Sequence, residues 1–171
     1  MGWALGALMT LAAPAWADTG TIESAVKATY LYKLAPFVSW PAGALAGGAP
    51  IVICVQGAPA FDRLVDRAAA GQRVGTHPIA VREVVRLDRG SGCHIAYLAG
   101  SPAQSTAEAL SAVNGAPVLT VTDSERGPAK GVVHLELIGG RVRFAVNAAL
   151  AGTDGLAISS KLLALAASVT R

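Results

Sequence analysis

Short apolar runs of β-forming residues alternate with segments of helical periodicity through the middle of this chain. The runs with the pattern of strands are 51–55, 78–85, 93–98 and 118–122. Between them, apolar residues at helical spacing predict one helix that stops at Gly71 and another over 102–113. Strands that alternate with helices pair in parallel through right-handed crossovers. We therefore expect an α/β fold, a three-layer sandwich with a mostly parallel central sheet and flanking helices.

The segment after Asp123 has a different pattern. Residues 132–138 and 141–146 alternate apolar and polar side chains, and Gly139-Gly140 joins the two runs. Two glycines between alternating runs are typical of a β-hairpin with a primed turn. We therefore expect a C-terminal β-hairpin, followed by a last helix over 159–169.

Apolar residues near the N-terminus recur at helical spacing and predict a long first helix. The residues that share this stripe, which we expect to face the core, are Ile22, Val26, Tyr30, Leu34 and Phe37. Pro36 should kink or end the helix, because proline removes a backbone donor, and Trp40-Pro41 closes it.

Residues 1–17 have the pattern of a secretory signal peptide. The stretch from Trp3 to Ala13 is apolar but too short for a stable membrane anchor, and Ala15-Trp16-Ala17 fits the small-x-small rule of signal peptidase. No Lys or Arg precedes this stretch, so the natural start can lie upstream of Met1. A buried N-terminal helix is the alternative, but the stretch lacks the amphipathic pattern of one. We expect cleavage before Asp18 and export to the periplasm.

Residues 18–171 have room for a single domain with a proper core and not for two. No later segment is apolar and charge-free over the roughly 20 residues that a spanning helix needs. The formal net charge is +3. This modest excess, without a run of Lys or Arg or interleaved aromatic residues, gives nucleic-acid binding little support.

Cys54 and Cys93 are the only cysteines of the chain. In an exported protein a pair of cysteines indicates a disulfide, whereas in the cytosol two cysteines with apolar neighbours would more often be buried free thiols. The first and third strands of a doubly wound sheet are commonly neighbours, so a Cys54–Cys93 bond is geometrically feasible, with the register deciding it.

The residues offer little for catalysis or for a metal. His77, His94 and His134 lie in different predicted elements, without the spacing of a metal site. There is no nucleophile elbow, no C-x-x-C pair and no glycine-rich phosphate loop. We therefore expect no cofactor and no metal, and a protein that is not an enzyme.

Two groups of residues are candidates for binding a partner or a ligand. The first is a cluster of aromatic residues in and after the first helix, Tyr30, Tyr32, Phe37 and Trp40. These either pack in the core or form a patch for a partner. The second is on the hairpin, where Arg141 and Arg143 share one face and either bind an acidic group or form a solvated surface. Asn147 stands at the end of that strand, in position to cap the next turn or helix.

Six segments, taken in order, resemble the YfiR family of periplasmic proteins. They are 26–41 (VKATYLYKLAPFVSWP), 53–57 (ICVQG), 93–97 (CHIAY), 117–123 (PVLTVTD), 143–147 (RFAVN) and 156–163 (LAISSKLL). Each segment alone is weakly specific, but together they extend over nearly all of residues 18–171. Cys54 and Cys93 fall on cysteine positions of the family, which favours the disulfide, while a second cysteine pair that some relatives carry in the C-terminal half is missing here.

The resemblance implies a regulator without catalysis. The best-known member of the family represses an inner-membrane diguanylate cyclase of the YfiN type by binding its periplasmic sensor domain, and an outer-membrane lipoprotein or redox stress releases it. Other members act beside sensor kinases. We expect a periplasmic repressor of such a membrane signalling protein, lowering cyclic-di-GMP and biofilm formation, and a homodimer. A periplasmic small-solute-binding protein that feeds a membrane sensor is the alternative, with the solute at the carboxyl edge of the sheet near residues 57–61. A hydrolase or redox enzyme has the least support.

Overall fold

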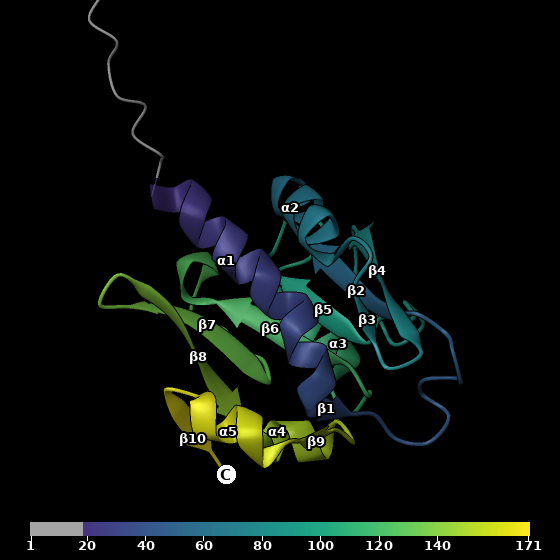
Figure 1. The fold of residues 1–171 in the computed structure, drawn as a ribbon. Coiled ribbons are helices and arrows are strands. Elements are labelled where there is room, and N and C mark those ends of the chain that lie inside the picture. Colours follow the sequence, from purple (N-terminus) through teal and green to yellow (C-terminus); the bar gives the residue numbers. More distant parts are fainter. Residues whose placement is uncertain (1–18) are drawn as a thin grey trace, which may run out of the picture.

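The computed structural model describes residues 19–171, and the predicted signal peptide over residues 1–17 lies outside them. In these residues a main sheet of eight strands has the order β10-β8-β7-β6-β5-β2-β4-β3 (Figure 1). Its strands are β2 (Ile51–Gln56), β3 (Arg73–Val74), β4 (His77–Val84), β5 (Ile95–Leu98), β6 (Leu119–Asp123), β7 (Val133–Ile138), β8 (Arg141–Asn147) and β10 (Ser168–Thr170). The five neighbouring strands β7, β6, β5, β2 and β4 are parallel to one another, which confirms the predicted mostly parallel sheet.

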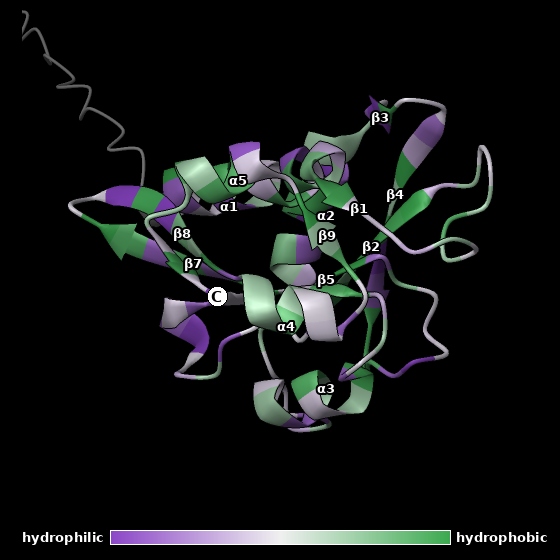
Figure 2. Ribbon diagram, turned by 90° about the horizontal axis from the view of Figure 1, so that it is seen from below, coloured by the Kyte–Doolittle hydropathy of each residue, from purple (hydrophilic) through white to green (hydrophobic). Residues whose placement is uncertain are grey.

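Helices cover both faces of this sheet, so the molecule has three layers (Figure 2). The helices are α1 (Thr19–Leu34), α2 (Pro59–Ala69), α3 (Thr106–Val113), α4 (Ala148–Thr153) and α5 (Ser160–Leu165), with 3₁₀ turns η1 (Ala35–Phe37) and η2 (Ser124–Arg126). Helices α1 and α2 lie on one face and α3 on the other. A small antiparallel sheet pairs β1 (Val38–Ser39) with β9 (Ala157–Ile158).

Alternation along the central strands divides the core into two clusters. Ile53 and Val55 of β2 belong to the large cluster beneath α1 and α2. Cys54, between them, belongs to the small cluster beneath α3. Because successive strand residues point to opposite faces, a continuous apolar run is required where helices cover both sides, and this is the pattern that the sequence shows.

The β-hairpin prediction is confirmed. Strands β7 and β8 pair in antiparallel register, with Ile138 opposite Arg141. Gly139 and Gly140 join them with φ of 58° and 72°. Positive φ at both turn residues is the signature of the primed hairpin turn and explains why both are glycine.

The predicted inner face of the first helix is confirmed for Leu34 and is wrong for Ile22 and Val26, which are 56% and 40% exposed. Tyr30 and Phe37 are half-buried against the core. The buried positions of α1 and η1 are Lys27, Ala28, Leu31, Leu34 and Ala35. The helix is rotated relative to the prediction because its buried lysine finds carboxylate partners from other elements, as described below.

Two helix boundaries also differ from the prediction. Helix α3 begins at Thr106 and not at Pro102, because Ser105 and Glu108 form a capping box: the Glu108 carboxylate accepts from the Ser105 backbone N–H at 2.7 Å. The last helix is only Ser160–Leu165, and the chain then extends as β10, which pairs in parallel with β8. Helix α4 was not predicted.

Candidate functional site

A groove of about 450 Å³ separates the N-terminal half of α1 from the β7–β8 hairpin. We call it the α1–hairpin groove. Residues from both elements form its lining: Ile22, Glu23, Val26, Tyr30, Leu137, Gly140, Arg141, Val142 and Arg143. It therefore brings together three of the residues singled out in the sequence, Tyr30 from the aromatic cluster and the two hairpin arginines.

Apolar side chains on one face of the β7–β8 hairpin form a wall of this groove. Leu137 is paired with Val142 across the two strands, so these two side chains share a face of the hairpin with Phe144. The Tyr30 ring packs edge-on against Phe144, with ring centroids 6.0 Å apart and planes at 64°. This aromatic contact is the point where α1 and β8 meet.

Part of the apolar surface around the groove is exposed. Leu137 and Ile138 at the tip of the hairpin are 46% and 50% exposed, and Figure 2 shows the end of β7 as hydrophobic beside a start of β8 that is partly hydrophilic. Of these two residues, Leu137 lines the groove, together with Ile22 and Val26 of α1. Contiguous exposed apolar surface of this kind is typical of protein interaction sites.

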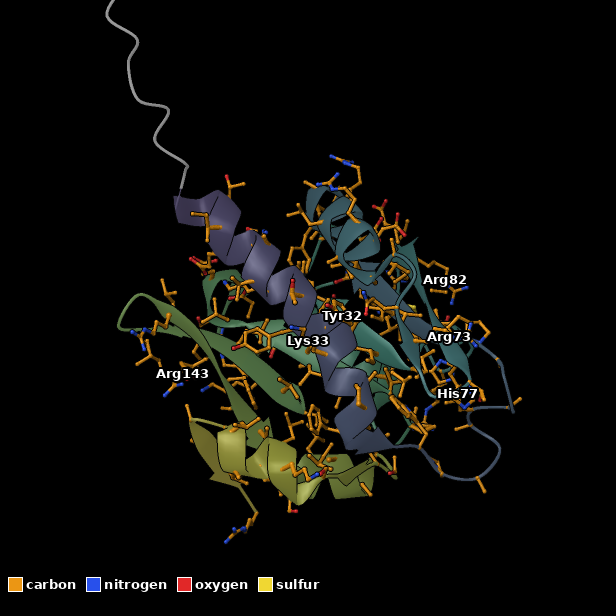
Figure 3. All side chains as sticks on the ribbon, viewed as in Figure 1. Tyr32, Lys33, Arg73, His77, Arg82 and Arg143 are labelled. Atoms are coloured by element: carbon orange, nitrogen blue, oxygen red, sulfur yellow. A yellow bond between two sulfur atoms is a disulfide. The ribbon has the colours of Figure 1, made fainter. Side chains whose placement is uncertain are left out.

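Two cations lie at the rim of the groove, on the face of β8 opposite to Val142 and Phe144. Arg141 and Arg143 are exposed, and neither makes a salt bridge with another described residue. Glu136 stands opposite Arg143 in the hairpin register, but its carboxylate lies 3.5 Å from Lys130 Nζ. Figure 3 shows Arg143 on the hairpin, at the opposite side of the molecule from Arg73, His77 and Arg82 of β3 and β4.

The α1 wall of the groove is tied to a buried charge network. The Lys27 ammonium lies 2.5 Å from Glu23 Oε1, 2.7 Å from Asp123 Oδ2 and 2.8 Å from Glu125 Oε2. The Lys27 and Asp123 side chains are only 3% and 2% exposed. Burial alone would lower the pKa of Lys27, but its bonds to these carboxylates, Asp123 first, outweigh burial and raise that pKa above its ordinary value. Lys27 therefore stays charged and joins α1 to the carboxyl end of β6.

Tyr97 of β5 extends the network. Its hydroxyl donates to Asp123 Oδ2 at 3.2 Å, and its ring stacks on Phe61 of α2 with centroids 4.4 Å apart. Burial and then the negative charge of Asp123 raise the pKa of the Tyr97 hydroxyl. The hydroxyl thus stays a proton donor.

Trp40, Phe37 and Tyr32 do not line the α1–hairpin groove. The Trp40 indole N–H donates to the His94 carbonyl at 3.3 Å, and its ring packs edge-on against the His94 imidazole with centroids 5.9 Å apart. Phe37 and Tyr32 are half-buried against the large core cluster. Four aromatic residues that are close in sequence thus lie in different environments.

Asn147 has the capping role expected of it. Its Oδ1 accepts from the Leu150 backbone N–H at 2.9 Å, at the start of α4. The side chain that the sequence offered as a binding residue is therefore used in ending β8 and beginning α4.

The predicted disulfide is confirmed. Cys54 of β2 is bonded to Cys93, just before β5, with the Cα atoms 5.8 Å apart. The two strands are neighbours in the sheet, as expected. The Arg82 guanidinium lies 3.8 Å and 3.9 Å from the two sulfurs.

The histidines have hydrogen-bonding roles. His94 Nδ1 accepts from the Val52 N–H at 3.0 Å, while Nε2 lies 3.0 Å from the Ala44 carbonyl, so the neutral ring fits both partners. His134 Nδ1 lies 2.8 Å from the Thr122 hydroxyl. Among residues 19–171 no group of three or more His, Cys, Asp or Glu is arranged to hold a metal ion.

The carboxyl end of β2, where a solute site was the alternative, is closely packed. Gln56 donates to the Gln104 carbonyl at 2.8 Å, and its Oε1 accepts from Gly100 N–H at 3.0 Å. A Cβ on Gly57 would lie 2.2 Å from the Gly100 oxygen. Protein groups thus occupy the space beside the 57–61 turn.

The Lys27 network was missed in the sequence. Glu23 and Lys27 are spaced i, i+4, which is a visible signal for a helical ion pair, but such pairs are usually on the surface. Asp123 was noted only as the end of a strand. Nothing local indicates that the sheet brings Asp123 beneath α1.

No helix of residues 19–171 is both long and apolar enough to cross a membrane. No curated protein sequence matches this chain. A model of the YfiR/HmsC-like family matches residues 24–167, which include the disulfide, Lys27 with Asp123 and Glu125, and the groove lining apart from Ile22 and Glu23. Since this match extends over most of the sequence, the chain belongs to the YfiR/HmsC-like family.

Proposed function

We propose that this protein is a periplasmic regulator without catalytic activity. It binds the periplasmic sensor domain of an inner-membrane signalling protein, a diguanylate cyclase or a sensor kinase, and represses it. Repression of a cyclase lowers cyclic-di-GMP and with it biofilm formation. Membership of the YfiR/HmsC-like family supports this function, and the exposed apolar α1–hairpin groove is the surface that supports binding to another protein.

The proposal includes the organisation of the chain. Residues 1–17 act as a cleaved signal peptide, and residues 18–171 form a single YfiR-like domain. The regulator acts as a homodimer, and an outer-membrane lipoprotein relieves the repression. The Cys54–Cys93 bond fits an oxidising compartment.

The character of the groove favours binding over chemistry. Its described lining includes no histidine, cysteine or serine. Its one carboxylate, Glu23, is bound by Lys27. A nucleophile beside a base is the minimum for most hydrolytic mechanisms, whereas apolar residues with flanking arginines are the composition of protein interfaces.

A deletion strain tests the function. We expect cyclic-di-GMP to rise when the gene is deleted and to return to the wild-type level when the exported protein is restored. A tagged, exported copy should recover a membrane signalling protein from detergent-solubilised membranes. An unchanged nucleotide level, together with recovery of no cyclase or kinase, would overturn the proposal.

The interface assignment has its own check. If Trp40→Ala and Arg143→Ala both folded and repressed normally, neither group of predicted binding residues would carry the interaction. If the Trp40→Ala variant repressed normally and the folded Arg143→Ala variant did not repress, the interface would lie on the hairpin side.

A further inference from the structure

We propose that the α1–hairpin groove binds an acidic amphipathic segment of the partner protein. Apolar side chains of that segment enter the groove, and its carboxylates pair with Arg141 and Arg143. This inference rests on the proposed function and names the chemistry that the partner must present at its contact with this protein.

The apolar half of the recognition follows from the exposed side chains. Val26 and Ile22 are one turn apart on α1, and Leu137 faces them from β7 across the groove. A volume of about 450 Å³ accommodates a few side chains, as in one or two turns of an amphipathic segment. The partner thus needs clustered apolar residues and not a single anchor.

The acidic half follows from the uncompensated charge. Arg141 and Arg143 are exposed at the groove and make no ion pair with a described residue. Glu23 of the groove lining is bound by Lys27, and Glu136, opposite Arg143 in the hairpin register, is bound by Lys130. Guanidinium groups pair well with carboxylates, in bidentate geometry. The groove is therefore complementary to an acidic segment and repels a basic one.

The same charges argue against a second copy of this chain as the occupant. A two-fold contact through the groove would present the same arginines from both copies. Glu23, the carboxylate in the lining, would have to leave Lys27 to offset them. A partner with a different, acidic surface meets no such repulsion.

Site-specific photocrosslinking tests this inference in the exporting host. A photoreactive phenylalanine analogue is placed at Leu137 in one variant and at Val26 in another. A third variant carries it at Val85, which is 71% exposed and follows β4, away from the groove. Mass spectrometry then identifies the crosslinked peptide. We expect both groove positions, and not Val85, to capture one segment that is rich in apolar and acidic residues.

Charge reversal completes the test. The double variant Arg141→Glu/Arg143→Glu should lower the crosslinking yield at least tenfold, while Arg141→Lys/Arg143→Lys retains most of it. Replacing the acidic residues of the captured segment by lysine should restore the yield in the Glu variant. Urea unfolding of each purified variant establishes that it is folded before the yields are compared.

The possible failures can be told apart. Capture of a basic or uncharged segment, or of a second copy of this chain, overturns the acidic-segment inference. Crosslinking yields that do not change on charge reversal also overturn it. So does the absence of any crosslink from Leu137 or Val26 while repression persists. In each case the deletion phenotype still decides the proposed function. Conversely, a captured acidic segment that belongs to no signalling protein, with cyclic-di-GMP unchanged on deletion, supports the groove chemistry and overturns the function.

Discussion

The Lys27 ammonium on α1 lies 2.7 Å from Asp123 Oδ2 at the end of β6, and both side chains are almost completely buried. The pair joins the helix that lines the groove to the carboxyl end of the central sheet. Removing one member leaves the other as an uncompensated buried charge, which costs more than the pair itself contributes.

Lys27→Met should lower the free energy of unfolding by about 3–5 kcal/mol, the range for breaking a buried ion pair. The reason is that Asp123 and Glu23 would be left near each other without their shared cation. Urea unfolding at neutral pH measures the loss. Lys33→Met, at an exposed position of the same helix, is the matched control and should change stability little. If both variants lowered the free energy of unfolding equally, the buried Lys27 network would make no specific contribution to stability.

Stability should fall on mild acidification because of half-buried His94 and buried His134. Burial lowers the pKa of His94 and of His134 below the ordinary 6.5. The unfolded chain then binds more protons than the folded one, so the stabilisation is complete above pH 6.5 and is lost as the pH falls through the folded pKa values.

The comparison that checks this uses His94→Gln. Urea midpoints of the wild type should decrease from pH 7.5 to pH 5, and the decrease should be smaller in the variant. It should not vanish, because His134 titrates in the same direction. If the urea midpoint changed with pH by the same amount in the wild type and in the variant, His94 would be excluded as a source of the pH dependence.

Reduction of the Cys54–Cys93 bond should destabilise the protein without unfolding it at neutral pH. The bond closes a loop with a sequence separation of 39, for which chain entropy gives about 4 kcal/mol. Urea unfolding with and without a thiol reductant measures this difference. The double variant Cys54→Ala/Cys93→Ala should already have the lower stability and should not respond to the reductant.

Gly57→Ala should be far more damaging than Gly71→Ala. Both glycines have positive φ, 77° and 73°, so an alanine is strained at either position. Only at Gly57 would the new Cβ meet backbone, 2.2 Å from the Gly100 oxygen, whereas nothing lies within 4 Å of it at Gly71. We expect a difference of at least about 2 kcal/mol in thermal or urea unfolding, on the order of other overpacked sites.

Val26→Asp should abolish repression while the protein stays folded. Val26 is 40% exposed and lines the groove, so an aspartate there is solvated in the free protein but introduces an unpaired charge into a bound interface. Cyclic-di-GMP in the complemented deletion strain is the measurement. Val85→Asp makes the same change at an exposed site away from the groove and should repress normally. Full repression by Val26→Asp would exclude this part of α1 from the interface.

The local pattern of the sequence predicted much of the fold. The apolar run in β2 and the glycine pair between β7 and β8 each determine their element from neighbouring residues alone. The Cys54–Cys93 bond followed from the expected adjacency of two parallel strands and from export. The hairpin alternation likewise placed Arg141 and Arg143 on one strand face before any tertiary contact was known.

The inner face of α1 and the composition of the groove were decided only by the tertiary structure. Helical spacing permits two stripes on α1, and the first two residues of the predicted one, Ile22 and Val26, are exposed. The buried stripe contains Lys27, which is stable there only because η2 and the end of β6 bring Glu125 and Asp123 to it. Periodicity counts apolar neighbours along one helix, whereas the cost of burying a charge depends on partners that are distant in sequence. That dependence is why the sequence determined the elements and the sheet, while the packing of the sheet against α1 determined which surface was left for a partner.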